Sequence, residues 1–373
     1  MKTIVLGGYG NVGARISRAL AQRPVFELVV AGRDAQRAAR LAGELPVGAS
    51  HAHLDAGDPD LGQRLKALGA QLVIHAAGPF QPQGYGAALA AAAAGAHYID
   101  LAHGRRFVCD FAASTGAAFR QANTMAITGA GAVPALSSAV IDALSAGWQQ
   151  VRSIDLCIAP GQTAPRGAAT LAAVLDDCGA PIQVWEQGQW RTRHGWAEPE
   201  RVDFHRLPPR LGALCDISDL ELLPQRYPGV RSVMFRAALE IGAAQWMLAA
   251  MSGLRRAGLL KSPARLAGLL HRAGKCLDRF GTALGGMVVR VEGVNAAGRL
   301  ARHAWHITVG DNHGAELPCM PAILLAERIA GGTLSAPGAH AAMGWLSLPD
   351  FTPEFERWGM TTHIVHERSG DGA

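Results

Sequence analysis

The sequence has little of what marks a metal protein, a nucleic-acid-binding protein or a membrane-spanning protein. Its six cysteines lie far apart and no Cys-x-x-Cys pair occurs, so neither a metal site nor a redox pair is predicted. No stretch reaches 18 apolar residues, which excludes a predicted transmembrane helix. Basic residues form no run longer than two, so nucleic acid is not expected as a partner, although the net charge of +5 would suit an anionic ligand.

The composition is that of a globular protein with two cores. Of the 373 residues, 49% are hydrophobic and 17% charged, which is enough apolar material for two folded domains. Met1-Lys2 leads directly into the first apolar run, which leaves no room for a signal peptide. We therefore expect a cytoplasmic protein with reduced thiols.

The strongest motif stands at the start of the chain. An apolar run at residues 3–6 is followed at once by Gly-x-Gly-x-x-Gly, formed by Gly8, Gly10 and Gly13, and then by a helical pattern. In a strand–turn–helix unit, these glycines permit the tight turn, let a pyrophosphate approach the backbone, and let the helix pack on the strand. The helix N-terminus then offers free N–H groups to the phosphates. The residues of this turn predicted to bind a dinucleotide are Gly8, Tyr9, Gly10, Asn11, Val12 and Gly13.

The end of the second predicted strand, residues 27–34, bears on the choice of cofactor. An acidic residue about 20 positions after the last fingerprint glycine would bind the ribose 2′-hydroxyl of NAD. Arg33 occupies that place and Arg37 follows one helical turn later, and a guanidinium suits a 2′-phosphate. We therefore expect NADP(H) in preference to NAD(H). Asp34 argues the other way, but it is also a good N-cap for the helix expected at 34–45.

Strands and helices then alternate up to residue 130, with six strands predicted in all, as in a Rossmann-type doubly wound parallel sheet. The fourth strand, 71–80, ends in a Gly-Pro loop that includes Ala77, Gly78, Pro79 and Phe80. The carboxyl edge of such a sheet holds the nicotinamide half of a dinucleotide. These four residues are therefore predicted to bind the cofactor.

Beyond residue 132 the pattern changes to long strands with wider spacing, including a hairpin around residues 295–298, which predicts an α+β domain with a mostly antiparallel sheet. The expected organisation is a Rossmann domain at 1–132 and a substrate or dimerisation domain at 133–318. A C-terminal segment, 319–373, would contain a helix near 321–331 that returns to the first domain.

Several segments together resemble the saccharopine dehydrogenase-like superfamily. They are Val5–Gly13, Ala31-Gly32-Arg33, Ala77–Phe80, Ala94–Leu101 and Gly131–Ser137, the last with Ala135 where glycine is more usual. The resemblance implies NAD(P)-linked hydride transfer, often on an imine or secondary amine, with substrate in the cleft between the domains, and a homodimer built on the second sheet. Other members of the superfamily, such as enoyl reductases of lipid-linked substrates, share the first domain and not the amine chemistry, so the substrate stays open.

Candidate proton carriers follow the fifth predicted strand, 96–101. Asp100 ends the strand and His103 lies just beyond it, so either residue could serve as the catalytic acid or base. Each also has a structural interpretation, as a turn cap for Asp100 and as a surface histidine for His103. His75 and Tyr98 lie within strands and are interpreted as packing groups.

In the second domain, residues 162–170 follow a strand and precede a helix. Arg166 and Thr170 are predicted to bind a carboxylate or phosphate of the substrate, the alternative being a plain turn. His303, Trp305 and His306 alternate along a strand without a nearby carboxylate or cysteine, and no metal site is predicted there.

Residues 239–277 form a helical insertion whose first half is apolar and whose second half is basic. It would either lie on a membrane surface or over a lipophilic substrate, or pack on the sheet or in a dimer interface, and packing is the preferred interpretation. We expect an NADP(H)-dependent oxidoreductase acting on a small molecule. The alternatives are a non-catalytic NADP(H) sensor or membrane-surface protein, and an enoyl-type reductase.

Overall fold

The computed structural model describes residues 1–46, 48–80, 83–165 and 168–368. The chain forms two compact units. The first comprises Met1–Ala139 and Glu316–Leu346, and the second comprises Val140–Ala315 and Ser347–Ala373. The sequence placed boundaries at 132/133 and 318/319 instead.

The first unit is built on a parallel sheet. Across the described residues it has seven strands in the order β15-β6-β5-β4-β1-β2-β3. The strands are β1 (Lys2–Leu6), β2 (Glu27–Gly32), β3 (Ser50–His53), β4 (Leu72–His75), β5 (His97–Asp100), β6 (Met125–Thr128) and β15 (Gly338–Ala341). The order β3-β2-β1-β4-β5-β6 is that of a Rossmann fold, so the predicted doubly wound sheet is confirmed.

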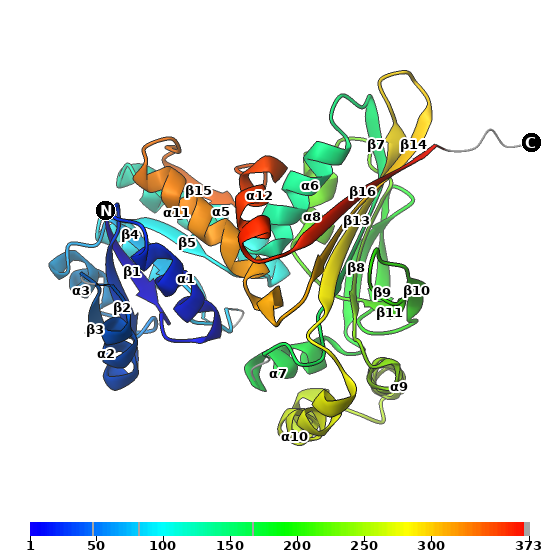
Figure 1. Cartoon of the computed structure of the whole chain (residues 1–373), viewed down its shortest axis with the longest axis horizontal. Coiled ribbons are helices and arrows are strands. Elements are labelled where there is room, and N and C mark those ends of the chain that lie inside the picture. The colour runs from blue at the N-terminus through cyan, green and yellow to red at the C-terminus, as the bar shows by residue number, and fades with distance from the viewer. Residues whose placement is uncertain (47, 81–82, 166–167, 369–373) are drawn as a thin grey trace, which may run out of the picture. The chain divides into compact units, whose positions relative to one another are not determined.

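Helices cover both faces of this sheet (Figure 1). They are α1 (Asn11–Ala21), α2 (Ala35–Glu44), α3 (Leu61–Ala67), α4 (Gly86–Ala93), α5 (Arg105–Gln121) and α11 (Met320–Ala330), with the short turns η1 (Ala132–Leu136) and η5 (Leu317–Cys319). Ion pairs join α1 to the returning segment, between Arg15 and Glu316 at 2.8 Å and between Arg23 and Glu327. The seventh strand, β15, was not predicted, because its sequence Gly-Ala-His-Ala lacks the β-branched and aromatic residues that mark a strand.

The second unit is built on a mostly antiparallel sheet, as predicted. Its path within the described residues is β10-β11-β12-β7-β13-β14-β16, with β8 paired to β12 and β9 paired to β8. The strands are β7 (Gln150–Ala159), β8 (Pro181–Glu186), β9 (Gln189–His194), β10 (Glu200–Val202), β11 (Arg210–Leu214), β12 (Ser232–Ala238), β13 (Gly285–Val294), β14 (Leu300–Val309) and β16 (Thr361–Arg368). Only β12 and β7 run parallel in this set. The predicted hairpin joins β13 to β14, with the amide of Asn295 donating to the carbonyl of Arg299.

Sequence patterns were less accurate in the middle of this unit. Strand β10 is short, Glu200–Val202, and β9, β11 and β16 were not predicted. Five of the six residues of β9 are polar or charged, and the strand lies mostly exposed at the sheet's margin, so it has no alternating apolar pattern to detect.

The helices of the second unit differ in what they cover. They are α6 (Ser137–Leu144, which begins in the first unit), α7 (Ala168–Asp177), α8 (Asp219–Arg226), α9 (Gly242–Arg256), α10 (Ala267–Leu277) and α12 (Leu348–Arg357), with the short turns η2 (Pro263–Leu266), η3 (Asp278–Phe280) and η4 (His313–Ala315). On one face of the sheet, Trp305 is buried with its ring centroid 6.1 Å from that of Phe355 in α12. The opposite face carries the small core of Cys157, Ala159, Val202, Ala238 and Val288. No helix among the described residues is both long and apolar enough to cross a membrane.

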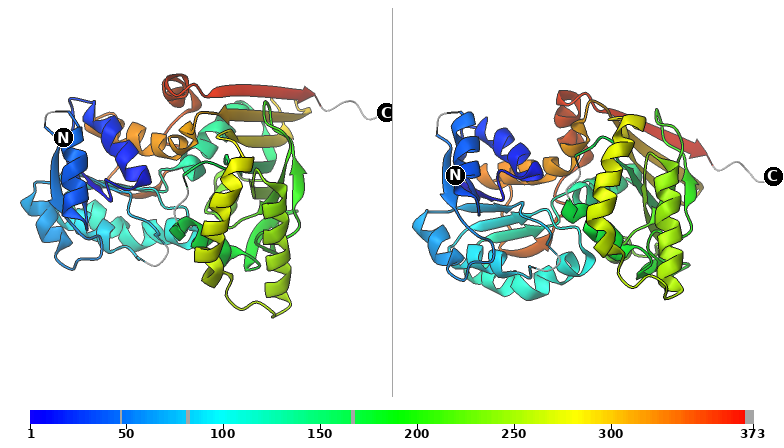
Figure 2. Two further views of the ribbon diagram at one scale, coloured as in Figure 1. Left: turned by 60° about the horizontal axis from the view of Figure 1, so that its bottom comes forward. Right: turned by 90° about the horizontal axis from the view of Figure 1, so that it is seen from below.

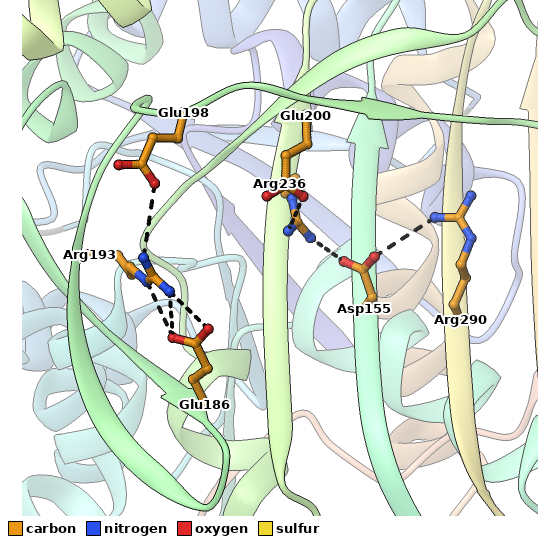
Figure 3. Close-up of polar contacts among 7 residues, drawn as sticks. All are labelled: Asp155, Glu186, Arg193, Glu198, Glu200, Arg236 and Arg290. Atoms are coloured by element: carbon orange, nitrogen blue, oxygen red, sulfur yellow. Dashed lines mark hydrogen bonds and ion pairs between the residues drawn. The ribbon is translucent and has the colours of Figure 1, made fainter.

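Charged side chains cross three neighbouring strands on that second face (Figure 3). Asp155 of β7 lies between Arg236 of β12, at 2.7 Å, and Arg290 of β13, at 3.9 Å. Arg236 also pairs with Glu200 at 2.7 Å and is only 13% exposed. Burial raises the pKa of Asp155 while both guanidinium groups oppose that shift. Arg236 therefore compensates a carboxylate that the sheet has partly removed from water.

Removing Arg236 is expected to destabilise the second unit more than removing an exposed arginine. Arg236→Ala deletes two charge-assisted bonds and leaves Asp155 poorly compensated, which we expect to cost roughly 2 kcal/mol of unfolding free energy. Arg193→Ala is the matched control, because Arg193 pairs with Glu186 at 2.8 Å but is 39% exposed, and we expect it to cost less than about 1 kcal/mol. Urea unfolding of both variants measures the difference, and equal losses would contradict this account.

Candidate cofactor site

The glycine-rich turn after β1 is too tightly packed for other residues. Gly7 has a φ of +75°, in the left-handed region. A Cβ on Gly13 would lie 2.2 Å from the carbonyl oxygen of Gly7, and a Cβ on Gly8 would lie 2.8 Å from that of Val5. Gly10 donates its amide to the carbonyl of Gly7 at 2.9 Å. The turn therefore requires glycine to bring α1 close to the strand.

The N-terminus of α1 is arranged to bind an anion. Gly10 is the N-cap, and no acidic residue stands in the first turn. Ala14 donates to the carbonyl of Gly10 at 2.8 Å, so the amides of Val12 and Gly13, which come before Ala14 in the first turn, are the ones without an intrahelical acceptor. These amides lie at the positive end of the helix dipole, which attracts an anion such as a pyrophosphate. The predicted fingerprint residues therefore fit a dinucleotide.

Tyr9 connects the turn to the end of β2. Its hydroxyl accepts a hydrogen bond from the amide of Asp34 at 2.8 Å, and its ring occupies the space where a side chain on Gly32 would stand. The guanidinium of Arg37 lies over the same ring, 4.8 Å from its centroid. Tyr9 therefore positions an arginine beside the end of β2, which the sequence spacing alone did not show.

Arg33 and Asp34 differ in how the fold uses them. Asp34 caps α2 by accepting the amide of Arg37 at 3.0 Å, as its N-cap interpretation predicted. Arg33 is exposed, and no hydrogen bond or ion pair holds its side chain among the described residues. Its guanidinium is thus available at the end of β2, where a ligand for the 2′-phosphate is expected.

The loop after β4 meets the glycine-rich turn directly. Leu6 and His75 are register partners at the ends of β1 and β4, and Gly7 approaches Ala77 so closely that a Cβ on Gly7 would lie 2.9 Å from it. Gln83, to which the sequence assigned no role, donates to the carbonyls of Ala77 and Pro79, each at 2.6 Å. The two predicted cofactor segments therefore adjoin at the point where the strand order reverses, which is where open α/β sheets bind ligands.

Within the second cofactor segment, the residues face different ways. Gly78 and Pro79 are exposed, whereas Phe80 is buried against His75, with ring centroids 5.0 Å apart, and against Phe107. Phe80 thus anchors the loop to the aromatic core, and Gly78 and Pro79 form its surface.

Asp100 is fully buried at the carboxyl end of β5. Its Oδ1 accepts hydrogen bonds from the Thr128 hydroxyl at 2.8 Å and from the amides of Ala102 and Gly129 at 2.9 and 3.0 Å. Burial raises the pKa of Asp100 to about 6, although these hydrogen bonds oppose the shift. The carboxylate therefore ties the end of β5 to the end of β6.

Beside it lies a buried pair that was interpreted as packing. Nδ1 of His75 is 2.9 Å from the Tyr98 hydroxyl, and the Tyr98 ring stacks on Phe111. Burial lowers the pKa of His75 to about 4, so its imidazole is neutral at pH 7. His75 and Tyr98 thus pack in the core, as expected, and also make a polar contact between the neighbouring strands β4 and β5.

The remaining predicted residues are placed as follows. The His103 side chain is exposed in the connection between β5 and α5. Arg166 lies outside the described residues, and so does the side chain of Thr170, whose backbone belongs to α7. No cluster of three His, Cys, Asp or Glu side chains with metal-binding geometry occurs in the part of the chain that the structure describes.

The first unit is similar to a known family of domains. Residues 3–127 match the family model described as saccharopine dehydrogenase NADP binding domain. The resemblance inferred from the sequence is therefore confirmed, and the bound group of the family is a nicotinamide dinucleotide.

Solved structures extend the likeness to the fold of the whole chain. Apo histidine-tagged saccharopine dehydrogenase (L-Glu forming) from Saccharomyces cerevisiae superposes with a TM-score of 0.71 at 14% identity, over 98% of this chain and 99% of that one. C. glutamicum DAP dehydrogenase in complex with DAP has a TM-score of 0.48 at 12% identity, over 95% and 98% of the two chains. No curated protein matches the sequence. At such identities the first likeness shows a shared fold, and the second is too low to carry an argument.

Replacing Gly13 with alanine is expected to abolish cofactor binding. The added Cβ would lie 2.2 Å from a backbone oxygen, so α1 must move away from the turn and its amides lose their alignment. Gly43→Ala is the control, because a Cβ there meets nothing within 4 Å. Fluorescence titration with NADPH measures both, and unchanged binding by the Gly13 variant would contradict the assignment.

Replacing Asp100 with asparagine is expected to change how stability depends on pH. The folded pKa of about 6 lies above the ordinary aspartate value of 3.8, so the folded state holds its proton more tightly, and wild-type stability falls as pH rises from about 4 to 6. Asp100→Asn cannot ionise and escapes this loss. We expect its unfolding free energy relative to wild type to rise by roughly 2–3 kcal/mol between pH 4 and pH 7. Urea unfolding across that range tests this, and parallel pH profiles would contradict it.

Proposed function

We propose that this protein is an NADP(H)-dependent oxidoreductase that transfers hydride to or from an imine, amine or related small substrate. The observation that carries the proposal is the uncapped N-terminus of α1 above a turn that admits only glycine, with Arg33 and Arg37 beside it. The NADP binding domain family of residues 3–127 supports the same cofactor.

The residues divide the work of binding. The amides of Val12 and Gly13 hold the pyrophosphate, and Arg33, with Arg37 positioned by Tyr9, holds the 2′-phosphate. Ala77, Gly78 and Pro79 form the surface beside the nicotinamide, and the buried Phe80 fixes their loop. The nicotinamide supplies the hydride donor or acceptor when it is bound.

Of the two predicted proton carriers, we favour His103. It occupies an exposed position just beyond β5, where desolvation lowers the pKa of its imidazole, whereas the Asp100 carboxylate is enclosed and already accepts three hydrogen bonds. Asp100 then acts as a positioning residue for the segment that carries His103. Binding of a substrate carboxylate or phosphate by Arg166 and Thr170 stays a prediction, as do the homodimer and the cytoplasmic location.

An imine or amine substrate is proposed because the superfamily resemblance favours it and because the yeast protein with the similar fold is a saccharopine dehydrogenase. A non-catalytic NADP(H) sensor and an enoyl-type reductase are the alternatives. These functions are distinguished by measuring NADPH oxidation in the presence of imines, enoyl compounds or aldehydes. A sensor would bind NADPH but would not oxidise it with any of these three classes of compound.

The cofactor preference is tested by Arg33→Ala. Losing one charge-assisted contact to the 2′-phosphate is expected to raise the Kd for NADPH about 10- to 100-fold and to leave the Kd for NADH nearly unchanged. Arg40→Ala is the matched control, because Arg40 is also exposed but lies further along α2. Calorimetric titration of the wild type and both variants with NADPH and with NADH measures how each substitution changes each Kd.

Two results would contradict the proposal at different levels. An equal loss of affinity for both cofactors would show that Arg33 does not read the 2′-phosphate. Absence of binding for either cofactor to the wild-type protein would overturn the oxidoreductase assignment itself.

A further inference from the structure

Helix α9 buries polar side chains and exposes apolar ones. On its inner side, Gln245 is fully buried and accepts the amide of Leu239 at 3.0 Å, and the hydroxyl of Ser252 donates to the carbonyl of Gly195 at 3.0 Å. Arg255 fastens the end of the helix by donating to the carbonyl of Cys178 at 2.9 Å. The inner side is therefore fixed to the second unit by directional bonds as well as by Leu248.

The outer side of the same helix is apolar. Trp246, Met247 and Leu254 are 58%, 40% and 45% exposed, and the exposed Ala250 and Gly253 lie between them. A surface helix of a water-soluble protein normally presents polar residues on this side. Burial within the unit cannot account for the exposed tryptophan and leucine, since the packing face is already occupied by other residues.

The following segments also expose apolar side chains. Leu259 is 77% exposed in the connection after α9, Leu269 of α10 is 67% exposed, and Phe280 after α10 is 69% exposed. Figure 2 shows α9 and α10 as neighbouring helices at one end of the second unit. We call the exposed side chains of Trp246, Met247, Leu254, Leu259, Leu269 and Phe280 the apolar surface.

The charge of this region has one sign. Residues 241–277 contain six Lys or Arg and no Asp or Glu, which leaves 29 basic and 30 acidic residues in the rest of the chain. All of the net positive charge of the protein therefore lies in the segment that exposes the most apolar side chains. Among the described side chains, Arg256, Lys261 and Arg265 are exposed.

We propose that the apolar surface binds to an anionic lipid surface. Apolar side chains with a tryptophan, surrounded by basic residues, are what an interfacial helix needs to enter the headgroup region while neutralising lipid charge. A second copy of this chain is the less favourable occupant, because a two-fold interface centred here brings two identical positive segments together without an acidic residue in either.

The apolar contribution is tested with the full-length protein and phosphatidylcholine vesicles containing phosphatidylserine. We expect cosedimentation that falls roughly 10-fold or more in Trp246→Gln combined with Leu254→Gln. The matched control combines Trp190→Gln with Leu300→Gln, because these side chains are 46% and 56% exposed elsewhere in the second unit. NADPH affinity of all proteins is measured alongside, since it reports folding of the first unit and is expected to stay constant.

The electrostatic contribution is tested separately. Arg256→Gln combined with Lys261→Gln is expected to weaken vesicle binding on the order of 30-fold, and Arg40→Gln combined with Arg299→Gln is the control of equal charge. Vesicles of phosphatidylcholine alone are expected to bind far less protein, and added salt is expected to weaken binding.

Three results would overturn the proposal. One is wild-type protein that stays in the supernatant with anionic vesicles, and another is equal loss in the control variants. The third is a change of oligomeric state, measured by light scattering, in Trp246→Gln with Leu254→Gln while vesicle binding is unchanged, which would identify a second copy as the occupant. Loss of NADPH binding by the wild-type protein would contradict the proposed oxidoreductase and leave this inference standing.

Discussion

The close approach of the turn after β1 to its own helix and to β4 is the constraint on which the first unit depends. The carbonyl of Gly7 accepts the amide of Gly10 and leaves no space for a Cβ at Gly13. On its other side Gly7 contacts Ala77. One close backbone approach therefore sets the direction of α1, the alignment of its N-terminal amides and the position of the loop after β4. A single methyl group at Gly13 disturbs all three, because the neighbouring atoms are backbone atoms that cannot rotate away.

A second constraint acts at the carboxyl ends of β5 and β6. The sheet removes the Asp100 carboxylate from water and then satisfies one of its oxygens with two amides and a hydroxyl. Burial still dominates, so the carboxyl group holds its proton more strongly than in water. Burying a carboxylate in a core costs free energy of folding. Here the buried carboxylate holds together the loops that leave two adjacent strands.

The second unit shows the opposite use of polarity in one of its helices. Sheet positions follow the expected rule, with Trp305 and its neighbours inside and ion pairs such as Asp155–Arg236 near the surface. Helix α9 departs from it by directing Gln245 and Ser252 inward and Trp246 outward. Sequence periodicity detects that such a helix is apolar, but it does not reveal which side meets the core, because both sides carry apolar residues. That is why residues 239–277 were preferentially interpreted as packing.

By itself, the sequence determined the features that depend on local spacing. Gly8, Gly10 and Gly13 after an apolar run specify strand, turn and helix within a few residues, Asp34 caps the next helix, and the alternation up to residue 130 specifies a parallel sheet. The tertiary structure alone decided which distant residues meet. It added β15 to the sheet edge, placed the ring of Tyr9 under Arg37, enclosed Asp100 with Thr128 and turned Trp246 outward. These outcomes depend on contacts between segments far apart in the chain, where the free energy comes from burial and hydrogen bonding that no local pattern encodes.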